Sequence, residues 1–225
     1  MKRLFITASG TETGKSYVAS LLIRQLRARG KKVRALKPLI TGFTDATARQ
    51  SDTCCLLDAL GLPMSDETIA SVSPWRFAAP LSPNMAASRE ARQINLKEVV
   101  AFCRAARNGP EDYLLIEGVG GVLVPLDDQY TVREWIMILQ MPALLVTGSY
   151  LGSISHTLTA LEALQSKGVP VTGIVVSESH ASTAPFAETL ETLARFSGGV
   201  RIQGLARNAD IGNAPDLTYL IDPAF

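Results

Sequence analysis

The sequence predicts an α/β fold with a doubly wound, mainly parallel sheet of about six or seven strands and flanking helices. Short β-branched and aromatic runs alternate along the chain with patterns of helical spacing. The first run leads into a glycine-containing loop that opens a helix. The chain has 225 residues, of which 47% are hydrophobic and 19% charged, so we expect a single domain over residues 1–225 with a full core.

The stretch Leu4–Ser16 has the pattern of a strand, a glycine-punctuated turn and a helix start. Gly14-Lys15-Ser16 ends a near match to a phosphate-binding loop, although Ser9 stands where the strict pattern has glycine. In such a loop, backbone N–H groups and the helix dipole converge on phosphate oxygens. Lys15 would add a positive charge, and the Ser16 hydroxyl would hold Mg²⁺. An ordinary helix start is the alternative.

The first helix is expected to run from Ser16 to about Arg29, with Gly30 as its C-terminal stop. The second strand is expected over Val33–Lys37, because Pro38 must end it. Lys37 would then lie at the carboxyl end of a strand, where open parallel sheets bind ligands. The alternative interpretation of Lys37 is a solvated lysine.

Residues 41–95 show less periodicity. A helix is expected over Asp52–Leu60, ending at Gly61. The prolines beyond it predict a long ordered loop over a site. These prolines are Pro63, Pro74, Pro80 and Pro83.

A carboxylate follows the next buried strand directly. A helix over residues 96–106 stops at Gly109-Pro110, and Tyr113–Ile116 forms the strand. This strand runs into Glu117-Gly118, where the turn is too small to cover the side chain. Because Mg²⁺ prefers oxygen ligands, Glu117 is a candidate second metal contact. A simple turn glutamate is the alternative.

The C-terminal half continues the same alternation. We expect strands over residues 143–147, 169–176 and 201–205. One helix should start near Ser155 and end at Gly168, and the next should contain Phe186 to Phe196.

Charge and cysteine content exclude several classes of protein. The formal net charge is +1, so no overall field would draw the chain to nucleic acid or to an anionic membrane. The N-terminal apolar run is too short for a secretory signal. The odd number of cysteines, 3, favours reduced thiols. We therefore expect a cytoplasmic protein.

Seven short motifs, taken together in this order and spacing, resemble the dethiobiotin synthetases, which are ATP-dependent enzymes of biotin synthesis. The resemblance extends over most of the chain and implies a fold of the P-loop NTPase class. The matching segments are Thr11–Ser16, Lys37–Gly42, Ser51-Asp52, Phe77–Pro83, Glu117–Gly121, Pro125-Leu126 and Leu151–His156.

The resemblance implies an ATP-dependent cyclo-ligase. CO₂ adds to one amine of 7,8-diaminopelargonic acid to give a carbamate, and ATP phosphorylates the carbamate. The second amine then attacks the mixed anhydride, which releases phosphate and closes the cyclic urea of dethiobiotin. The implied cofactor is Mg²⁺, with ATP as co-substrate, and the expected assembly is a homodimer with the substrate site at the interface.

The site residues implied by the resemblance fall into four groups. The catalytic residues are Lys37, Lys15 and Thr11. The nucleotide-binding residues are Gly10, Glu12, Thr13, Gly14, Lys15, Ser16, Tyr17, Ser177, Leu205, Arg207 and Asn208. The substrate-binding residues are Thr11, Lys37, Thr41, Gly118, Gly152, Ser153 and Ser155. The metal ligands are Ser16, Asp52 and Glu117.

Some positions depart from the family pattern. Ser177 stands where the family has an asparagine that recognises adenine, which predicts weaker discrimination between nucleobases. Ser155 replaces an asparagine that helps to hold the substrate carboxylate. His156 is either a catalytic base or a structural histidine at a helix start.

Two other functional classes share the phosphate loop. A partition or septum-site switch ATPase normally carries a lysine early in the loop, whereas positions 8–10 here are Ala, Ser and Gly. An amide-forming synthetase of the cobyrinate type would need a glutaminase partner, and the sequence has no nucleophilic cysteine motif for one.

Overall fold

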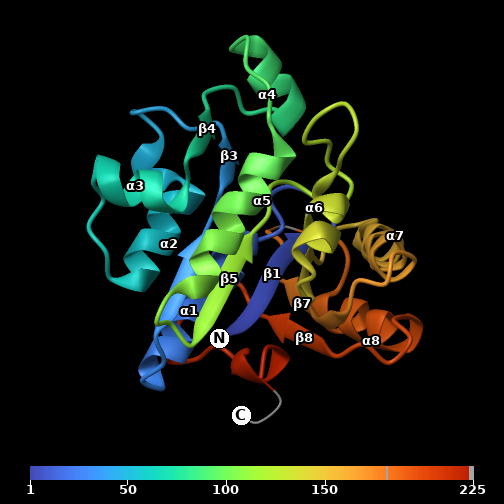
Figure 1. Cartoon of the computed structure of the whole chain (residues 1–225). Coiled ribbons are helices and arrows are strands. Elements are labelled where there is room, and N and C mark those ends of the chain that lie inside the picture. Colours follow the sequence, from blue (N-terminus) through green and yellow to red (C-terminus); the bar gives the residue numbers. More distant parts are fainter. Residues whose placement is uncertain (181, 223–225) are drawn as a thin grey trace.

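The computed structural model describes residues 1–180 and 182–222, and within them a parallel sheet forms the centre of the molecule (Figure 1). Its strand order is β2-β5-β1-β6-β7-β8, and each neighbouring pair is parallel. The strands are β1 (Lys2–Ala8), β2 (Val33–Leu36), β5 (Tyr113–Glu117), β6 (Ala143–Gly148), β7 (Val171–Ser177) and β8 (Ile202–Leu205). A second, two-stranded parallel sheet pairs β3 (Leu39–Thr41) with β4 (Trp75–Phe77).

Helices cover both faces of the six-stranded sheet, which gives three layers (Figure 1). Apolar residues of α1 and α2 pack with Leu4 and Ile6 on one face. Those of α5, α6 and α7 pack with Phe5 on the other, where its ring meets Trp135 edge-on at 4.9 Å. The helices are α1 (Lys15–Ala28), α2 (Asp52–Leu60), α3 (Asp66–Val72), α4 (Pro83–Arg89), α5 (Leu96–Ala105), α6 (Val132–Leu139), α7 (Ser153–Gln165) and α8 (Phe186–Phe196).

Strands covered on both faces have continuous apolar runs rather than alternating ones. Every residue of β5 and β6 is buried, which explains the sequences Tyr113–Glu117 and Ala143–Gly148. The doubly wound parallel fold predicted from the sequence is confirmed.

The sequence-based expectations miss three features. Strand β3 was not expected, and the segment after α2, expected to be a long ordered loop, contains α3, β4 and α4. Helix α6 was not expected, although its capping box joins Thr131 and Glu134. Helix α7 begins at Ser153, before the expected Ser155, because Gly152 supplies a left-handed turn with φ of 97°.

The topology brings three chemically important segments to one edge. Strands β2, β5 and β1 are neighbours, and parallel strands end at the same edge of a sheet. The phosphate loop follows β1, Lys37 follows β2, and Glu117 is the last residue of β5. The fold therefore places loop, lysine and carboxylate next to one another.

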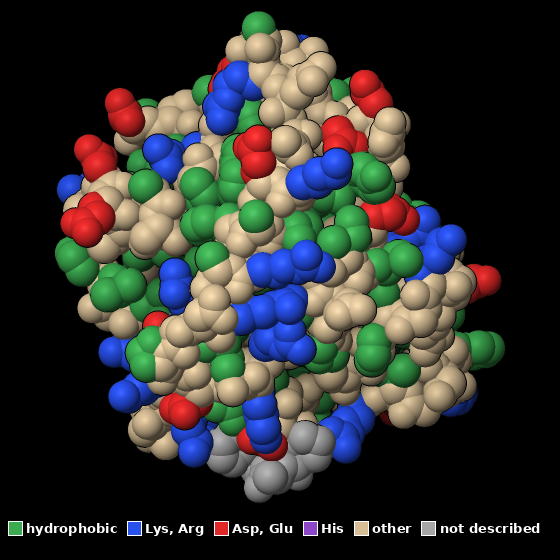
Figure 2. Space-filling view, in the orientation of Figure 1, with side chains coloured by type: hydrophobic (Ala, Val, Ile, Leu, Met, Phe, Trp, Pro, Cys, Tyr) green, Lys and Arg blue, Asp and Glu red, His purple; other side chains and the backbone are tan. Residues whose placement is uncertain are grey.

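Basic side chains gather near the centre of the molecular face that carries α5 and α6 (Figure 2). Arg104, in α5, and Arg107 donate hydrogen bonds to the carbonyls of Ile138 and Leu139 at the C-terminal end of α6. Burial, followed by the charges of Arg3 and Arg104, lowers the pKa of Arg107. These arginines stabilise the negative end of α6.

No helix in the described ranges has the length and apolar character needed to cross a membrane.

Candidate active site

The loop between β1 and α1 curves through two residues with positive φ. Glu12 has φ of 57° and Gly14 has φ of 88°. A side chain at Gly14 would meet Ser177, since a Cβ there would lie 2.8 Å from its Oγ. A Cβ at Gly121 would lie 3.2 Å from Gly10 Cα, so the loop after β5 also approaches the phosphate loop closely. Glycine is therefore required at Gly14 by both backbone conformation and space.

A buried ion cluster lies beside this loop. Lys37 is 1% exposed, and its Nζ donates to Glu117 Oε1 at 2.6 Å and to the Gly118 carbonyl at 2.7 Å. The same Nζ lies 2.9 Å from Asp52 Oδ2. The Ser16 hydroxyl donates to Glu117 Oε1 at 2.7 Å. The alternative interpretation of Lys37 as a solvated lysine is therefore wrong, and Glu117, 1% exposed, is not a solvated turn glutamate.

The charges in this cluster determine the protonation of its members. Burial alone would raise the pKa of Asp52, but the Lys37 ammonium, a hydrogen bond from Ser16 and the charge of Lys15 together outweigh burial and lower that pKa to about 2. Burial would lower the pKa of Lys37, but Glu117 and Asp52 together raise it above its usual value. Burial, and then the charge of Lys37, lowers the pKa of Lys15 to about 8. At neutral pH Asp52 is thus a carboxylate, and Lys37 and Lys15 are ammonium groups.

The oxygen atoms of Ser16, Asp52 and Glu117 form a donor set of the kind that Mg²⁺ prefers. Glu117 Oε2 is buried and accepts no hydrogen bond within the described residues. The Asp52 side chain is 43% exposed, so part of the set faces the cavity. Among the residues described, no group of three or more His, Cys, Asp and Glu side chains could hold a metal. A metal here would accordingly complete its coordination with water or with oxygens of a bound phosphate.

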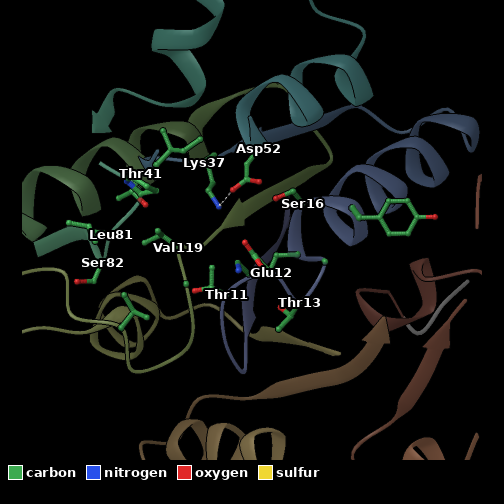
Figure 3. A pocket seen from close by; sticks show the side chains of 17 residues that line it. Thr11, Glu12, Thr13, Ser16, Lys37, Thr41, Asp52, Leu81, Ser82 and Val119 are labelled. Atoms are coloured by element: carbon green, nitrogen blue, oxygen red, sulfur yellow. Dashed lines mark ion pairs between the residues drawn. The ribbon is translucent and has the colours of Figure 1, made fainter. Parts of the chain in front are cut away.

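A cavity of about 690 Å³ opens above the cluster (Figure 3). In Figure 3 the side chains of Lys37 and Asp52 point toward each other, with Ser16 beside them. Ten of the sequence-predicted site residues line this cavity. They are Thr11, Glu12, Thr13, Gly14, Lys15, Ser16, Tyr17, Lys37, Thr41 and Asp52. Glu117 and Gly118 lie beneath it and contact Lys37.

A second cavity of about 350 Å³ shares the phosphate loop as a wall. Ser177, Arg207 and Asn208, which were predicted to bind nucleotide, line it together with Glu12, Thr13, Gly14 and Tyr17. Glu178 Oε2 accepts a hydrogen bond of 2.9 Å from the Arg207 backbone N–H and so shapes this cavity. The side chain of Leu205 is fully buried in the core.

The predicted substrate residues Gly152, Ser153 and Ser155 do not line the main cavity. They lie at the start of α7, where Ser153 Oγ is buried and, within the described chain, has no hydrogen-bond partner. A chain of hydroxyls links this turn to the phosphate loop: Thr157 donates to Thr147 at 2.8 Å, and Thr147 shares a hydrogen bond of 2.8 Å with Ser9.

A third cavity, of about 560 Å³, lies between the phosphate loop and α7. Gly10 and Thr11 line it together with Tyr150 and His156. Tyr150 and His156 are joined by a 2.9 Å hydrogen bond between the phenol and Nδ1. His156 does not line the main cavity. Its position therefore does not decide between a catalytic base and a structural histidine at the start of a helix.

Sequence reasoning missed several residues that shape these cavities. Several of them lie within the recognised motifs Lys37–Gly42, Phe77–Pro83 and Glu117–Gly121 but were given no role, and nothing in the local pattern of the others separates them from ordinary loop residues. In the main cavity they are Ile40, Pro80, Leu81, Ser82, Val119, Gly120 and Val124, and in the second cavity Glu178, Ser179 and His180.

Comparisons with known proteins agree with this geometry. A family model described as an AAA domain matches residues 2–215. The chain is 46% identical to the ATP-dependent dethiobiotin synthetase BioD of Acidiphilium cryptum, over 88% of this chain and 89% of that protein. It is also 46% identical to the protein of the same name from Methylobacterium nodulans, over 92% and 94%.

A solved structure, the signal recognition particle receptor FtsY from Elizabethkingia anophelis, resembles the fold with a TM-score of 0.54. It is 12% identical, and the match covers 98% of this chain and 64% of the receptor, so it supports the fold alone. The relatives are alike over nearly their whole length and carry one shared name. The chain therefore belongs to the ATP-dependent dethiobiotin synthetase family.

Proposed function

We propose that this protein converts 7,8-diaminopelargonic acid, CO₂ and ATP into dethiobiotin, ADP and phosphate, through a carbamate and a carbamic-phosphoric mixed anhydride. The observation that carries the proposal is the position of Lys37. Its ammonium lies between the phosphate loop and a cavity large enough for a second substrate, among carboxylates that hold it in place. A switch ATPase has no need of a substrate cavity at this point.

The nucleotide would occupy both cavities that share the phosphate loop. Its phosphates would lie along the backbone N–H groups near Gly14 and the start of α1, where the helix dipole favours anions. Lys15, which is 7% exposed and lines the main cavity, would lie on the outer phosphates. The base would enter the second cavity, beside Ser177, Arg207 and Asn208.

The diamine would lie in the main cavity between Thr11 and Thr41. One amine attacks CO₂ and loses a proton, which leaves an anionic carbamate. Lys37 and Lys15 would offset its charge and that of the transferring phosphoryl group. The carbamate oxygen then attacks the γ-phosphorus, and ADP leaves. Finally, the second amine attacks the carbamoyl carbon, phosphate is expelled, and the ring closes.

Ser16, Asp52 and Glu117 would hold Mg²⁺. When bound, the ion supplies charge neutralisation of the phosphate oxygens. The structural reasons for this assignment are Glu117 Oε2, which has no hydrogen-bond partner among the described residues, and the half-exposed side chain of Asp52.

The start of α7 would bind the carboxylate of the diamine from a second copy of the chain. Ser153 Oγ, unpaired among the described atoms, lies in the first turn of a 13-residue helix, where N–H groups favour an anion. Leu151, adjacent to this turn, is 82% exposed, as expected for a side chain covered by a partner. The proposed active form is thus a homodimer, with each substrate site completed by both copies.

The test is the dependence of ADP release on the other two substrates. We expect release by the purified protein with Mg²⁺ and ATP to require diaminopelargonic acid and bicarbonate together. Release stimulated by DNA or by lipid vesicles, with no effect of the diamine, would instead identify a switch ATPase. Release that requires a carboxylate substrate and ammonia would identify an amide-forming synthetase.

A further inference from the structure

The Lys37 ammonium is fully engaged by the groups proposed to bind the metal. An ammonium group has three N–H donors. Lys37 Nζ has three oxygen neighbours at short distance: Glu117 Oε1 at 2.6 Å, the Gly118 carbonyl at 2.7 Å and Asp52 Oδ2 at 2.9 Å. Two of these neighbours belong to proposed metal ligands.

Mg²⁺ and the Lys37 ammonium cannot occupy the same position between Asp52 and Glu117. A Mg²⁺ ion binds carboxylate oxygens at about 2.1 Å, so an ion shared by Glu117 Oε1 and Asp52 Oδ2, the two carboxylate oxygens that now contact Nζ, would lie where Nζ now lies or directly beside it. Repulsion between the two cations is strong because Lys37 and Glu117 are each 1% exposed and little water screens them. Binding of the ion is therefore coupled to displacement of the ammonium.

The Lys37 side chain borders a space that can accept the displaced ammonium. It lines the 690 Å³ cavity, and its backbone follows β2 directly, so a rotation of its side chain would move Nζ from the carboxylates toward that space. Thr11 and Thr41 line the same space. The displaced ammonium would thus meet the carbamate end of the substrate.

We propose that Lys37 is the resting counter-ion of the metal site, and that a divalent cation binds Asp52 and Glu117 by exchanging with the Lys37 ammonium. The inference rests on the metal ligands assigned under the proposed function. One exchange then accomplishes two tasks: it opens the metal site, and it delivers a positive charge to the carbamate. The free protein binds divalent cations weakly, and the metal enters with the nucleotide phosphates, which supply the missing ligands.

The test measures Mn²⁺ binding to the protein in the absence of nucleotide. Binding is detected as a decrease in the electron paramagnetic resonance signal of free Mn²⁺. Lys37→Met removes the competing charge and keeps a side chain of similar length. We expect it to bind one Mn²⁺ about tenfold more tightly than wild type or better. Lys32→Met is the matched control, because Lys32 is exposed and precedes the opposite end of β2. It should bind Mn²⁺ like wild type.

A second variant locates the ion. Lys37→Met combined with Glu117→Gln should lose the gain in affinity. No gain in a folded Lys37→Met protein, or a gain that persists in the double variant, would overturn the proposal. If Lys37→Met fails to fold by circular dichroism, Lys37→Gln retains hydrogen-bond donors without the charge and must show the same gain. Because the assay contains no substrate, its outcome is independent of whether wild-type protein forms dethiobiotin.

Discussion

Substitution of Gly14 by alanine tests how the phosphate loop is held against β7. Gly14 has φ of 88°, a conformation that costs an alanine about 1 kcal/mol. A Cβ there would also lie 2.8 Å from Ser177 Oγ and 3.1 Å from Ser177 Cβ, and such overpacking costs about 1–3 kcal/mol. We expect Gly14→Ala to lower the free energy of unfolding by about 2–4 kcal/mol, measured by urea denaturation.

Gly30 offers a matched control. Its φ is 71°, yet a Cβ there would meet nothing within 4 Å. Gly30→Ala should therefore lose only the conformational part, about 1 kcal/mol. In a Ser177→Gly background, which removes both crowding atoms, the cost of Gly14→Ala should fall to that of Gly30→Ala. Equal losses for Gly14→Ala and Gly30→Ala in the wild-type background would refute the reasoning.

Further substitutions test the roles assigned in the site. Lys15→Ala should lower kcat about a hundredfold to a thousandfold, because it removes a charge that stabilises the transferring phosphoryl group. A Lys15→Ala protein with the kcat of wild type would show that this loop does not bind the reacting phosphates. Lys37→Gln should bind MgATP at least as tightly as wild type in calorimetry but form no product, and a loss of nucleotide affinity that matches the loss of activity would instead place Lys37 at the nucleotide. Asp52→Asn and Glu117→Gln should each raise the Mg²⁺ concentration at half-maximal rate, whereas unchanged values in both would remove them from the metal site. Because the Ser177 hydroxyl lacks the paired donor and acceptor of an amide, CTP or GTP should give kcat/KM within about a hundredfold of ATP, and an ATP preference of about a thousandfold would contradict this.

The fold could be predicted because the strands and long helices carry strong local signals. Tyr113–Ile116 and Ala143–Val146 are apolar runs of strand length. Helix α2 spans the expected Asp52–Leu60, and α8 contains the apolar residues expected of it, from Phe186 to Phe196. The short elements of residues 41–95 could not be predicted. Strands β3 and β4 have three residues each and exist through pairing across more than thirty positions, with Leu39 opposite Trp75. No local pattern encodes such a pairing.

The candidate site was predictable to the extent that its residues follow strands. Lys37 and Glu117 each come at or directly after a strand end, so the parallel topology brought them together as expected. Their direct contact of 2.6 Å and the burial of Lys37 were not predictable, because typical lysines are solvated. The roles assigned to Gly152, Ser153 and Ser155 remain predictions, since they lie outside the main cavity and depend on a second copy of the chain.

Product formation from labelled bicarbonate tests the central claim most directly. Purified protein is incubated with MgATP, diaminopelargonic acid and carbon-13-labelled bicarbonate, and the products are analysed by mass spectrometry. The proposed reaction predicts dethiobiotin that carries the label in its ureido carbon, with one phosphate released per molecule of product, and neither without ATP. Phosphate release without labelled dethiobiotin, under varied nucleotide and pH, would contradict the proposed function.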